Sequence, residues 1–470
     1  MLKKLIGTTG TTGTVTRPSP SKRLIINNLQ LKMTKKMKYD ISKSTAPKMP
    51  KLGKGTECVA ILLSQVSKDM HEPIVPMLFP ILGAHVSGTE FMYPDQSWKE
   101  PSGMLANLVA DSGAGKGQLS GLIEAICRNF RSHDDEELTK LVEWQKMMKT
   151  KSANKEKPVR PDVAFWFPPA DVTNAAFIQN AMGCEKLGQR TQYLNMPEVE
   201  MADRMCGGHK QISQMMRNIY DRQRAGALRA TADGVTGNPI LRANITISST
   251  PFAARKFYKN ELFNGTFGRV VFSYKPRLGR DGRIPRQGKY GDEFYQQLDE
   301  YLARLDACKG RFIIQPLNKL TDHLAQDMAR LADLADDDVL WDISKRALVS
   351  AWKAGCLLWA LNNQTWTKPM ANLVEWLVYH DIWSKMQVFA DLLGQDVDSI
   401  SEAGRRGPKN LLDDLPNSFN ETQLEALRIS LGKTKDGTNN QLRKWQFRKF
   451  VTYSAQTGMY TKTKEYLKGE

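Results

Sequence analysis

The sequence predicts an α/β protein with a mostly parallel sheet, a helical region after it and a small C-terminal domain. Short apolar runs separated by helical stretches indicate the sheet. A continuous helical periodicity indicates the second region, and a helix, a turn, a basic helix and a hairpin pattern indicate the third. We expect a flexible basic arm over 1–55, the sheet-containing core over 56–290, a helical subdomain over 291–400 and a C-terminal domain over 401–470.

The bulk composition favours a globular protein with an anionic partner. The chain has 470 residues, 41% of them hydrophobic and 25% charged, which allows several domains and a buried core. Its 67 Lys and Arg residues exceed its 50 Asp and Glu residues, and the formal net charge is +17. This excess favours nucleic acid as the partner, with a membrane surface second. The six cysteines form no C-x-x-C pair, so we expect a reducing setting without disulfides or structural zinc.

The arm over 1–55 is rich in Gly, Thr, Ser and Pro and then in Lys, with Asp40 as its only acid. Such a composition buries little apolar surface, so the arm is either a basic contact segment or simply a solvated tail. Its first residues, MLKKLIGTTGTTGTV, lack the apolar run of a signal peptide. The most apolar stretch, 73–86, contains three prolines and is shorter than the roughly 20 residues that span a bilayer. We therefore expect a cytoplasmic protein that does not enter a membrane.

Residues 105–110 form a short apolar run that directly precedes a glycine-rich turn, which predicts a buried strand followed by a helix over 118–130. A charged helical insertion is expected over 133–157. Further strands are predicted over 163–167, 191–196, 244–250 and 267–274.

The turn between the first strand and its helix is a candidate phosphate-binding loop. The pattern G-x-x-x-x-G-K-[ST] requires a glycine at position 110 and a hydroxyl at position 117, and this chain has Ala110 and Gly117 instead. The order of strand, glycine turn and helix is the one such a loop requires, although a structural turn with an incidental lysine remains the alternative. The predicted phosphate-binding residues are Asp111, Ser112, Gly113, Ala114, Gly115, Lys116, Gly117 and Gln118.

Polar side chains also follow the next two predicted strands. Glu198 and Glu200 come just after 191–196, where nucleotide hydrolases place carboxylates that hold the metal and orient water. The alternative is that the two acids begin a surface helix. Ser249 and Thr250 end the strand over 244–250. Ligands of parallel sheets bind at the carboxyl ends of the strands, so Lys116 and these residues are expected to meet there.

Of the next two regions, only the basic one is expected to contact nucleic acid. Basic residues dominate 217–289, which suits contact with a phosphate backbone or with the nucleotide of a neighbouring subunit, or else forms a solvated surface. In 291–400, Trp and Leu recur at helical spacing and are expected to form core rather than a base-stacking platform. Residues 404–408 are expected to form a linker.

The C-terminal domain has the order of a winged helix-turn-helix. Residues 418–421 have the spacing of a capping box before a first helix, and 453–467 are expected to form a wing. In the second helix Leu442, Trp445 and Phe450 are expected to point inward. The predicted DNA-binding residues on its outer face are Arg443, Lys444, Arg448 and Lys449.

Several segments, taken together, resemble the primase-helicase-like P-loop ATPases that phages, plasmids and integrative mobile elements carry. They are ILGAHVSGTEF, NLVADSGAGKGQLSGLIEAI, ADVTNAAFIQNA, QYLNMPEVEMADRM, ITISSTPFA and NGTFGRVVFSY, within residues 56–390. The resemblance implies a RecA-like or AAA-like P-loop core, ATP with Mg²⁺, and a ring or partial ring of identical subunits that processes DNA. The departures from the family pattern are Ala110 and Gly117, and Gly117 is the more serious because the hydroxyl that it lacks normally ligates the magnesium ion.

The resemblance also implies a role for each candidate residue. Lys116 would hold the phosphates, and Glu198 or Glu200 would act at the metal and the attacking water, with Glu198 as the metal ligand. Ser249 or Thr250 would sense the γ-phosphate. Arg269 would serve as an arginine finger in a neighbouring subunit.

Two functions are therefore expected. The first is a DNA-dependent ATPase that acts as helicase or replication initiator for a mobile element, with a primase or other replication proteins as partners. The second is a non-hydrolysing DNA-binding protein in which a degenerate P-loop serves as scaffold or nucleotide switch.

Overall fold

The structure is a computed structural model that divides into two units, 1–394 and 395–470, which are described separately. It describes residues 39, 41, 45–150, 158–203, 209–226, 235–262, 265–277, 288–335, 338–393, 411–412, 414–430, 435–447 and 449–463.

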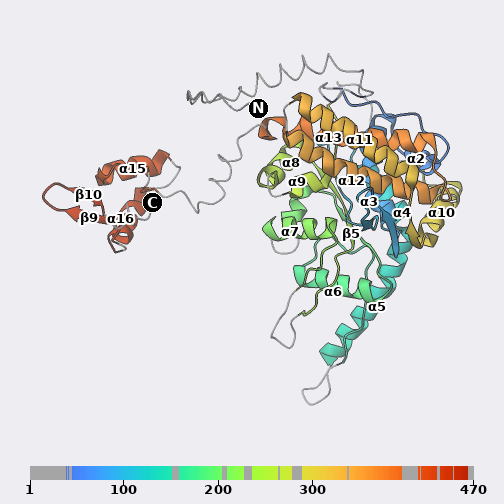
Figure 1. Cartoon of the computed structure of the whole chain (residues 1–470). Helices are drawn as coiled ribbons and strands as arrows, with labels where there is room; N and C mark the ends of the chain where they lie inside the picture. The colour runs from blue at the N-terminus through green and yellow to red at the C-terminus, as the bar shows by residue number, and fades with distance from the viewer. Residues whose placement is uncertain are drawn as a thin grey trace, which may run out of the picture. The chain divides into compact units, whose positions relative to one another are not determined.

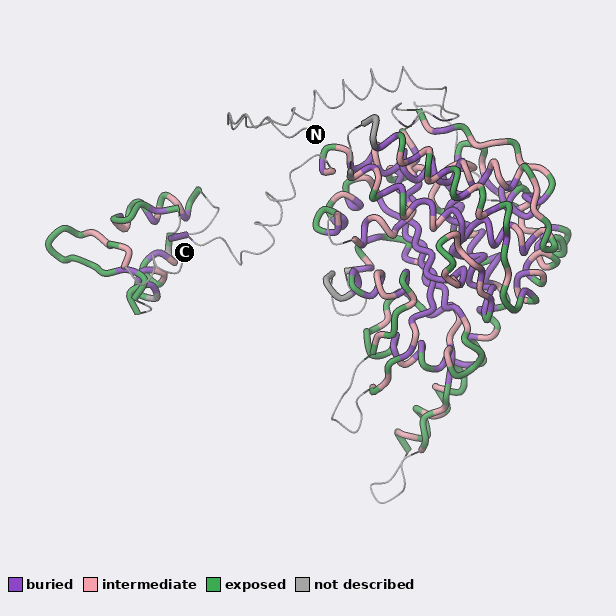
Figure 2. Tube along the Cα trace, viewed as in Figure 1, coloured by how far each residue is buried: buried purple, intermediate pink, exposed green. Residues whose placement is uncertain are grey.

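A four-stranded parallel sheet lies at the centre of the first unit, with the strand order β4-β5-β3-β6. Val109 at the end of β3 pairs with Ser249 of β5 on one side and with Tyr274 of β6 on the other. All five residues of β3 and all seven of β5 are buried, and the sheet is the buried centre in Figure 2. The predicted parallel sheet is confirmed. Its strands are β3 (Leu105–Val109), β4 (Gln192–Met196), β5 (Ala243–Ser249) and β6 (Val270–Tyr274).

Helices cover this sheet and build one continuous core with it (Figure 1). Helix α3 (His71–Gly83) packs on β3, β5 and β6, and α13 (Lys368–Leu393) packs on β6. The other helices of the unit are α2 (Glu57–Leu63), η2 (Lys68–Met70), α4 (Gly117–Ile126), α5 (Arg128–Thr150), α6 (Asn174–Lys186), η3 (Val199–Asp203), α7 (His209–Tyr220), α8 (Pro251–Tyr258), η5 (Lys259–Glu261), α9 (Thr266–Arg269), α10 (Asp292–Ala307), α11 (Gln315–Ala335) and α12 (Asp338–Leu361).

The region over 291–393 is helical as predicted, apart from strand β7 (Gly310–Phe312). Strand β7 joins β1 (Thr89–Met92) and β2 (Trp98–Lys99) in a second small sheet. The expectation that the tryptophans form core is confirmed for Trp352, Trp376 and Trp383, which are almost completely buried. These helices share their apolar core with the parallel sheet.

One predicted strand is wrong. Residues 163–167 form no strand, although Tyr193 N donates one hydrogen bond to Trp166 O. Side chains take the backbone N–H groups that a strand would use: Asp134 accepts from Trp166 N and Phe167 N, both at 2.7 Å, and Asn180 accepts from Phe165 N at 2.7 Å. The segment is therefore fixed by α5 and α6 rather than by a strand ladder.

Two predicted boundaries also differ. Residues 267–269, expected at the start of a strand, belong to the short helix α9, which begins after Gly265 in a left-handed conformation with φ 87°. The helix expected over 118–130 divides at Cys127 into α4 and α5, and α5 extends to Thr150, where it projects from the body in Figure 1. Residues 151–157 of the predicted insertion lie outside the described residues.

The described residues of the second unit form the helices α15 and α16, the short 3-10 helix η6 and a three-stranded sheet of order β8-β10-β9. Strands β9 and β10 pair as a hairpin over 451–462 within the region expected to form a wing over 453–467, of which 464–467 lie outside the described residues. Leu442 and Trp445 are buried as expected, whereas Phe450 is 39% exposed. The capping box is formed by Asn420 and Gln423, each of which accepts a hydrogen bond from the other's backbone N–H, rather than by the residues predicted. The elements are β8 (Ser418–Phe419), α15 (Glu421–Ser430), η6 (Lys435–Gly437), α16 (Thr438–Phe447), β9 (Val451–Ser454) and β10 (Met459–Lys462).

Candidate functional site

The glycine-rich loop connects β3 to α4 at the carboxyl edge of the central sheet. Gly113 and Gly115 have φ angles of 75° and 91°, the left-handed region that favours glycine. A side chain at Gly113 would meet no atom within 4 Å, so the outer face of the loop is open. Helix α4 begins at Gly117 directly after the loop, and its N-terminus therefore faces the same space.

Lys116 lies between the ends of β3 and β5. Its Nζ donates to the carbonyl oxygens of Ala110 at 2.6 Å, Asp111 at 3.2 Å and Ser249 at 3.3 Å. Partial burial lowers the pKa of this ammonium, although nearby carboxylates act in the opposite direction. The groups that bond directly to Lys116 Nζ are neutral carbonyls, so the positive charge of the ammonium is available to an anion placed beside it.

The charges of the predicted acids act on this lysine. Asp111, Glu198 and Glu200 each oppose the lowering of the Lys116 pKa, so all three carboxylates lie within electrostatic reach of its ammonium. Both glutamates are exposed and follow β4, the strand at the edge of the sheet. The carboxyl edge of the sheet thus gathers Lys116 with the acids that the sequence predicted there.

The two hydroxyls at the end of β5 face other partners. Ser249 Oγ donates to the buried Asn107 of β3 at 2.9 Å, and Thr250 Oγ1 accepts from Ala253 N at 3.2 Å as the cap of α8. Ser249 meets Lys116 through its carbonyl oxygen only. A phosphate-sensing role for either hydroxyl stays a prediction.

Arg269 lies at the amino end of β6, opposite the edge that carries the loop. Its Nη2 pairs with Asp221 at 2.6 Å and its Nη1 donates to Gly265 O at 2.8 Å. The guanidinium also lies 5.6 Å from the ring centroid of Tyr220, and its side chain is 13% exposed. Arg269 therefore cannot reach the loop of its own subunit, and an action on a neighbour would require it to leave Asp221.

Sequence reasoning missed two cations at the loop, Lys275 and Arg277. Lys275 follows β6, which lies beside β3, and its buried Nζ donates to Ala114 O of the loop at 2.8 Å while it pairs with Asp69 at 2.5 Å. Arg277 Nε lies 3.9 Å from Asp111 Oδ2 and is mostly exposed. The sequence could have revealed Lys275. Ser249 was selected because a polar residue stands at the end of a buried strand, and Lys275 directly follows such a strand.

The segment before α3 also holds the loop. Gln118, predicted as a ligand contact, is buried and accepts from Ser67 N at 2.7 Å. Two residues after Ser67, Asp69 pairs with Lys275. We call Ser67, Asp69, Gln118 and Lys275 the loop clasp. It holds the loop at Ala114 O through Lys275 and at Gln118 through Ser67.

The predicted DNA-binding residues belong to the second unit. The side chains of Arg443 and Lys449 are exposed, as expected of a binding face. Nothing is described of the side chain of Lys444, and Arg448 lies outside the described residues.

No protein-family model matches the sequence, and no curated protein matches it.

Within the described residues, no three His, Cys, Asp or Glu side chains form a group that could hold a metal ion. No helix in the described part of the chain combines the length and apolar character needed to cross a membrane.

Proposed function

We propose that the chain is a P-loop ATPase with a RecA-like or AAA-like core, and that it acts on DNA as a helicase or replication initiator of a mobile element. The observation that carries the proposal is the position of Lys116, at the carboxyl ends of two adjacent parallel strands beside a glycine loop and a helix N-terminus. Backbone N–H groups at such a place bind phosphate oxygens, and the lysine ammonium adds the charge.

The surrounding charges suit a nucleotide with its metal. Lys116 and Arg277 would neutralise phosphate oxygens at the loop, whereas Asp69 already balances the charge of Lys275. Mg²⁺ takes one or two protein carboxylates and completes its shell with phosphate oxygens and water. Glu198 would supply a carboxylate to the ion and Glu200 would orient water. Both carboxylates act electrostatically on Lys116, and within the described residues they belong to no group of three metal-ligating side chains.

Assembly and DNA binding complete the proposal. Hydrolysis would require a ring or partial ring in which Arg269 of one subunit leaves Asp221 and meets the nucleotide of the next. The basic arm, the basic loops over 217–289 and the exposed Arg443 and Lys449 would contact the DNA backbone, with a C-terminal winged helix as the DNA-binding domain. Such a protein would work in the cytoplasm with a primase or other replication proteins.

Gly117 favours a second candidate, a DNA-binding protein that does not hydrolyse ATP. A glycine offers no hydroxyl to the magnesium ion, and the loop clasp gives the loop a structural role of its own. The loop would then act as a scaffold or a nucleotide switch. The ATPase and the nucleotide switch both require nucleotide binding, and only the ATPase requires turnover, whereas a loop that is only a scaffold requires neither.

Calorimetric titration of the full chain with ATP and Mg²⁺ tests the shared requirement. We expect binding by the wild type and a loss of at least tenfold in affinity for Lys116→Ala, with Lys256→Ala as the control because Lys256 is exposed on α8. Absence of measurable ATP binding by the wild type would contradict the ATPase and the nucleotide switch, and would leave the scaffold role.

A further inference from the structure

A small polar cavity lies at the amino edge of the central sheet, on the opposite edge from the loop. Its walls come from residues that precede β3, from the turn after α7 and from α12. The cavity encloses about 210 Å³. Its lining residues are Trp98, Lys99, Glu100, Tyr220, Asp221, Arg222, Arg346, Val349 and Lys353.

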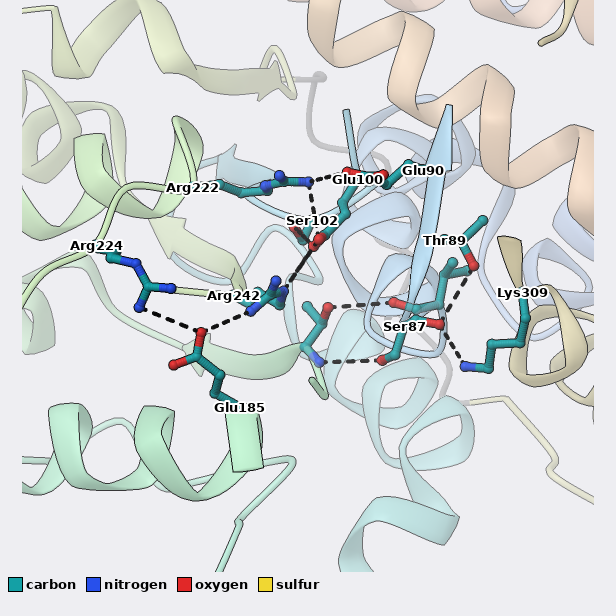
Figure 3. Close-up of polar contacts among 12 residues, drawn as sticks. Ser87, Thr89, Glu90, Glu100, Ser102, Glu185, Arg222, Arg224, Arg242 and Lys309 are labelled. Carbon is teal, nitrogen blue, oxygen red and sulfur yellow. Dashed lines mark hydrogen bonds and ion pairs between the residues drawn. The ribbon is translucent and has the colours of Figure 1, made fainter. Parts of the chain in front are cut away.

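Positive charge exceeds negative charge in this lining. Four cations face two carboxylates, and both carboxylates already have arginine partners behind the wall. Glu100 pairs with Arg242 at 3.1 Å as well as with Arg222 at 3.0 Å (Figure 3). Asp221 pairs with Arg269 at 2.6 Å and lies 4.0 Å from Arg346. Outside the lining, Asp95 lies 3.7 Å from Lys99 and Glu90 lies 3.7 Å from Arg222. Of the four cations, Lys353 is therefore the one without an ion pair among the described residues.

Lys353 is the most deeply buried of these cations, with 3% of its surface exposed. Its Nζ donates to Ser102 O at 2.6 Å and lies 4.8 Å from the ring centroid of Tyr220. No carboxylate among the described residues lies within 4 Å of this nitrogen, and burial lowers its pKa to about 7. A buried ammonium without a counter-charge is costly, so an anion in the cavity would stabilise it.

The turn that carries Arg222 is rigid. Arg222 has a φ of 52°, a conformation that an arginine rarely adopts. Just beneath the turn, a Cβ placed at Gly103 would lie 2.5 Å from Ile219 O, so no larger residue fits between the two segments. Strained residues held by their surroundings are concentrated at binding sites, because the strain fixes a side chain in a useful direction.

We propose that this cavity binds a phosphate group. Arginine and lysine together match phosphate oxygens, with the guanidinium able to bind two oxygens at once. A water molecule occupies about 30 Å³, so the cavity has room for a phosphate group and several waters. Arg346 and Lys99, whose side chains are 40% and 29% exposed, leave the mouth open to solvent. The site does not depend on nucleotide binding at the loop.

The phosphate could be a free anion or part of a polynucleotide backbone, and both sources can be tested in one background. Lys116→Ala in the full chain weakens the loop as a competing phosphate site. We would combine Lys116→Ala with Arg346→Gln in one variant, and with Lys345→Gln in the matched control. Lys345 is the preceding residue on α12, is 49% exposed and pairs with Asp342 at 2.6 Å outside the cavity. Circular dichroism melts establish that each variant folds.

Inorganic phosphate and a short labelled single-stranded oligodeoxynucleotide are the probes. We expect Arg346→Gln to weaken binding of inorganic phosphate at least tenfold, with little change in Lys345→Gln. A parallel loss of oligonucleotide affinity would assign the cavity to a backbone phosphate, and unchanged oligonucleotide affinity would assign it to a free phosphate. Equal phosphate affinity in the two variants, or no phosphate binding in the Lys116→Ala background, would overturn the proposal. Lys99→Gln is the second variant should Arg346→Gln fail to fold.

Discussion

Gly117 is the residue at which this chain departs most from a magnesium-binding P-loop. It is exposed and begins α4, so a hydroxyl there would enter the space above the loop without disturbing the core. We expect Gly117→Ser to tighten binding of Mg²⁺ with ATP or to raise turnover several-fold, because the hydroxyl adds a metal ligand. Gly117→Ala is the control, since it adds the same Cβ without the oxygen. Equal effects of the two substitutions would assign any change to helix stability rather than to the metal.

Lys353 gives the fold a pH dependence whose sign follows from its lowered pKa. The pKa falls from its ordinary value of 10.5 to about 7 on burial, so the unfolded chain binds more protons between these values. Stability contributed by this residue therefore rises with pH across that window and is constant below it. The charged and titratable groups that face it are Lys99, Glu100, Tyr220, Asp221, Arg222, Arg346 and Cys356.

Lys353→Met tests this sign. We expect the free energy of unfolding of the wild type to rise relative to that of the variant by about 1 to 3 kcal/mol between pH 7 and pH 9. Chemical denaturation at several pH values measures it, and Lys345→Met, at an exposed position, should show no such trend. A constant difference between wild type and Lys353→Met would mean that the buried lysine keeps its charge throughout.

At the scale of elements, the loop clasp links η2, β6 and the glycine loop. Hydrogen bonds from Lys275 and Ser67 hold the pKa of Asp69 below its ordinary value in spite of partial burial, so its contribution to stability is present at neutral pH and is lost as the pH falls through that lowered pKa. Because the Asp69 side chain is 43% exposed, we expect Asp69→Asn to cost only about 1 kcal/mol at pH 7. The cost should disappear at acidic pH in urea unfolding. Asp342→Asn, at an ion pair on the surface of α12, serves as the control.

The elements of the core could be predicted where apolar runs are short and bounded. Such runs predicted strands β3, β4 and β5. The helical stretches between these strands were enough to predict a parallel sheet. The failed strand over 163–167 has the same apolar pattern. Its backbone donors are taken by Asp134 and Asn180, which come from other elements, and no local pattern encodes that competition.

The candidate site was predictable to the same extent. The sequence could place Lys116, Glu198 and Glu200 together because each of them follows the carboxyl end of a predicted strand. The contact of Lys275 with Ala114 depends on β6 lying beside β3 in register, which the sequence does not state. The partners of Ser249 and Arg269 depend equally on the packing of distant segments.

At the scale of the whole molecule, the two units have separate apolar cores. Trp445, which is 6% exposed, belongs to the smaller core. We expect Trp445→Ala to destabilise the second unit by about 3 to 5 kcal/mol while the melting transition of the first unit stays in place. Scanning calorimetry of the full chain measures the two transitions, with Phe447→Ala as the control because Phe447 is 84% exposed. A shift of the first unit's transition by Trp445→Ala would contradict two independently folded units.

The central claim is that Lys116 serves an ATPase that responds to DNA. Phosphate release from ATP by the wild type, by Lys116→Ala and by the control Lys345→Ala, each with and without single-stranded DNA, tests it most directly. We predict that DNA stimulates the wild type and Lys345→Ala, and that Lys116→Ala loses about a hundredfold or more of the rate, the cost of removing one group that stabilises transition-state charge. Hydrolysis that is absent from the wild type with DNA present, or that survives unchanged in Lys116→Ala, would contradict the claim.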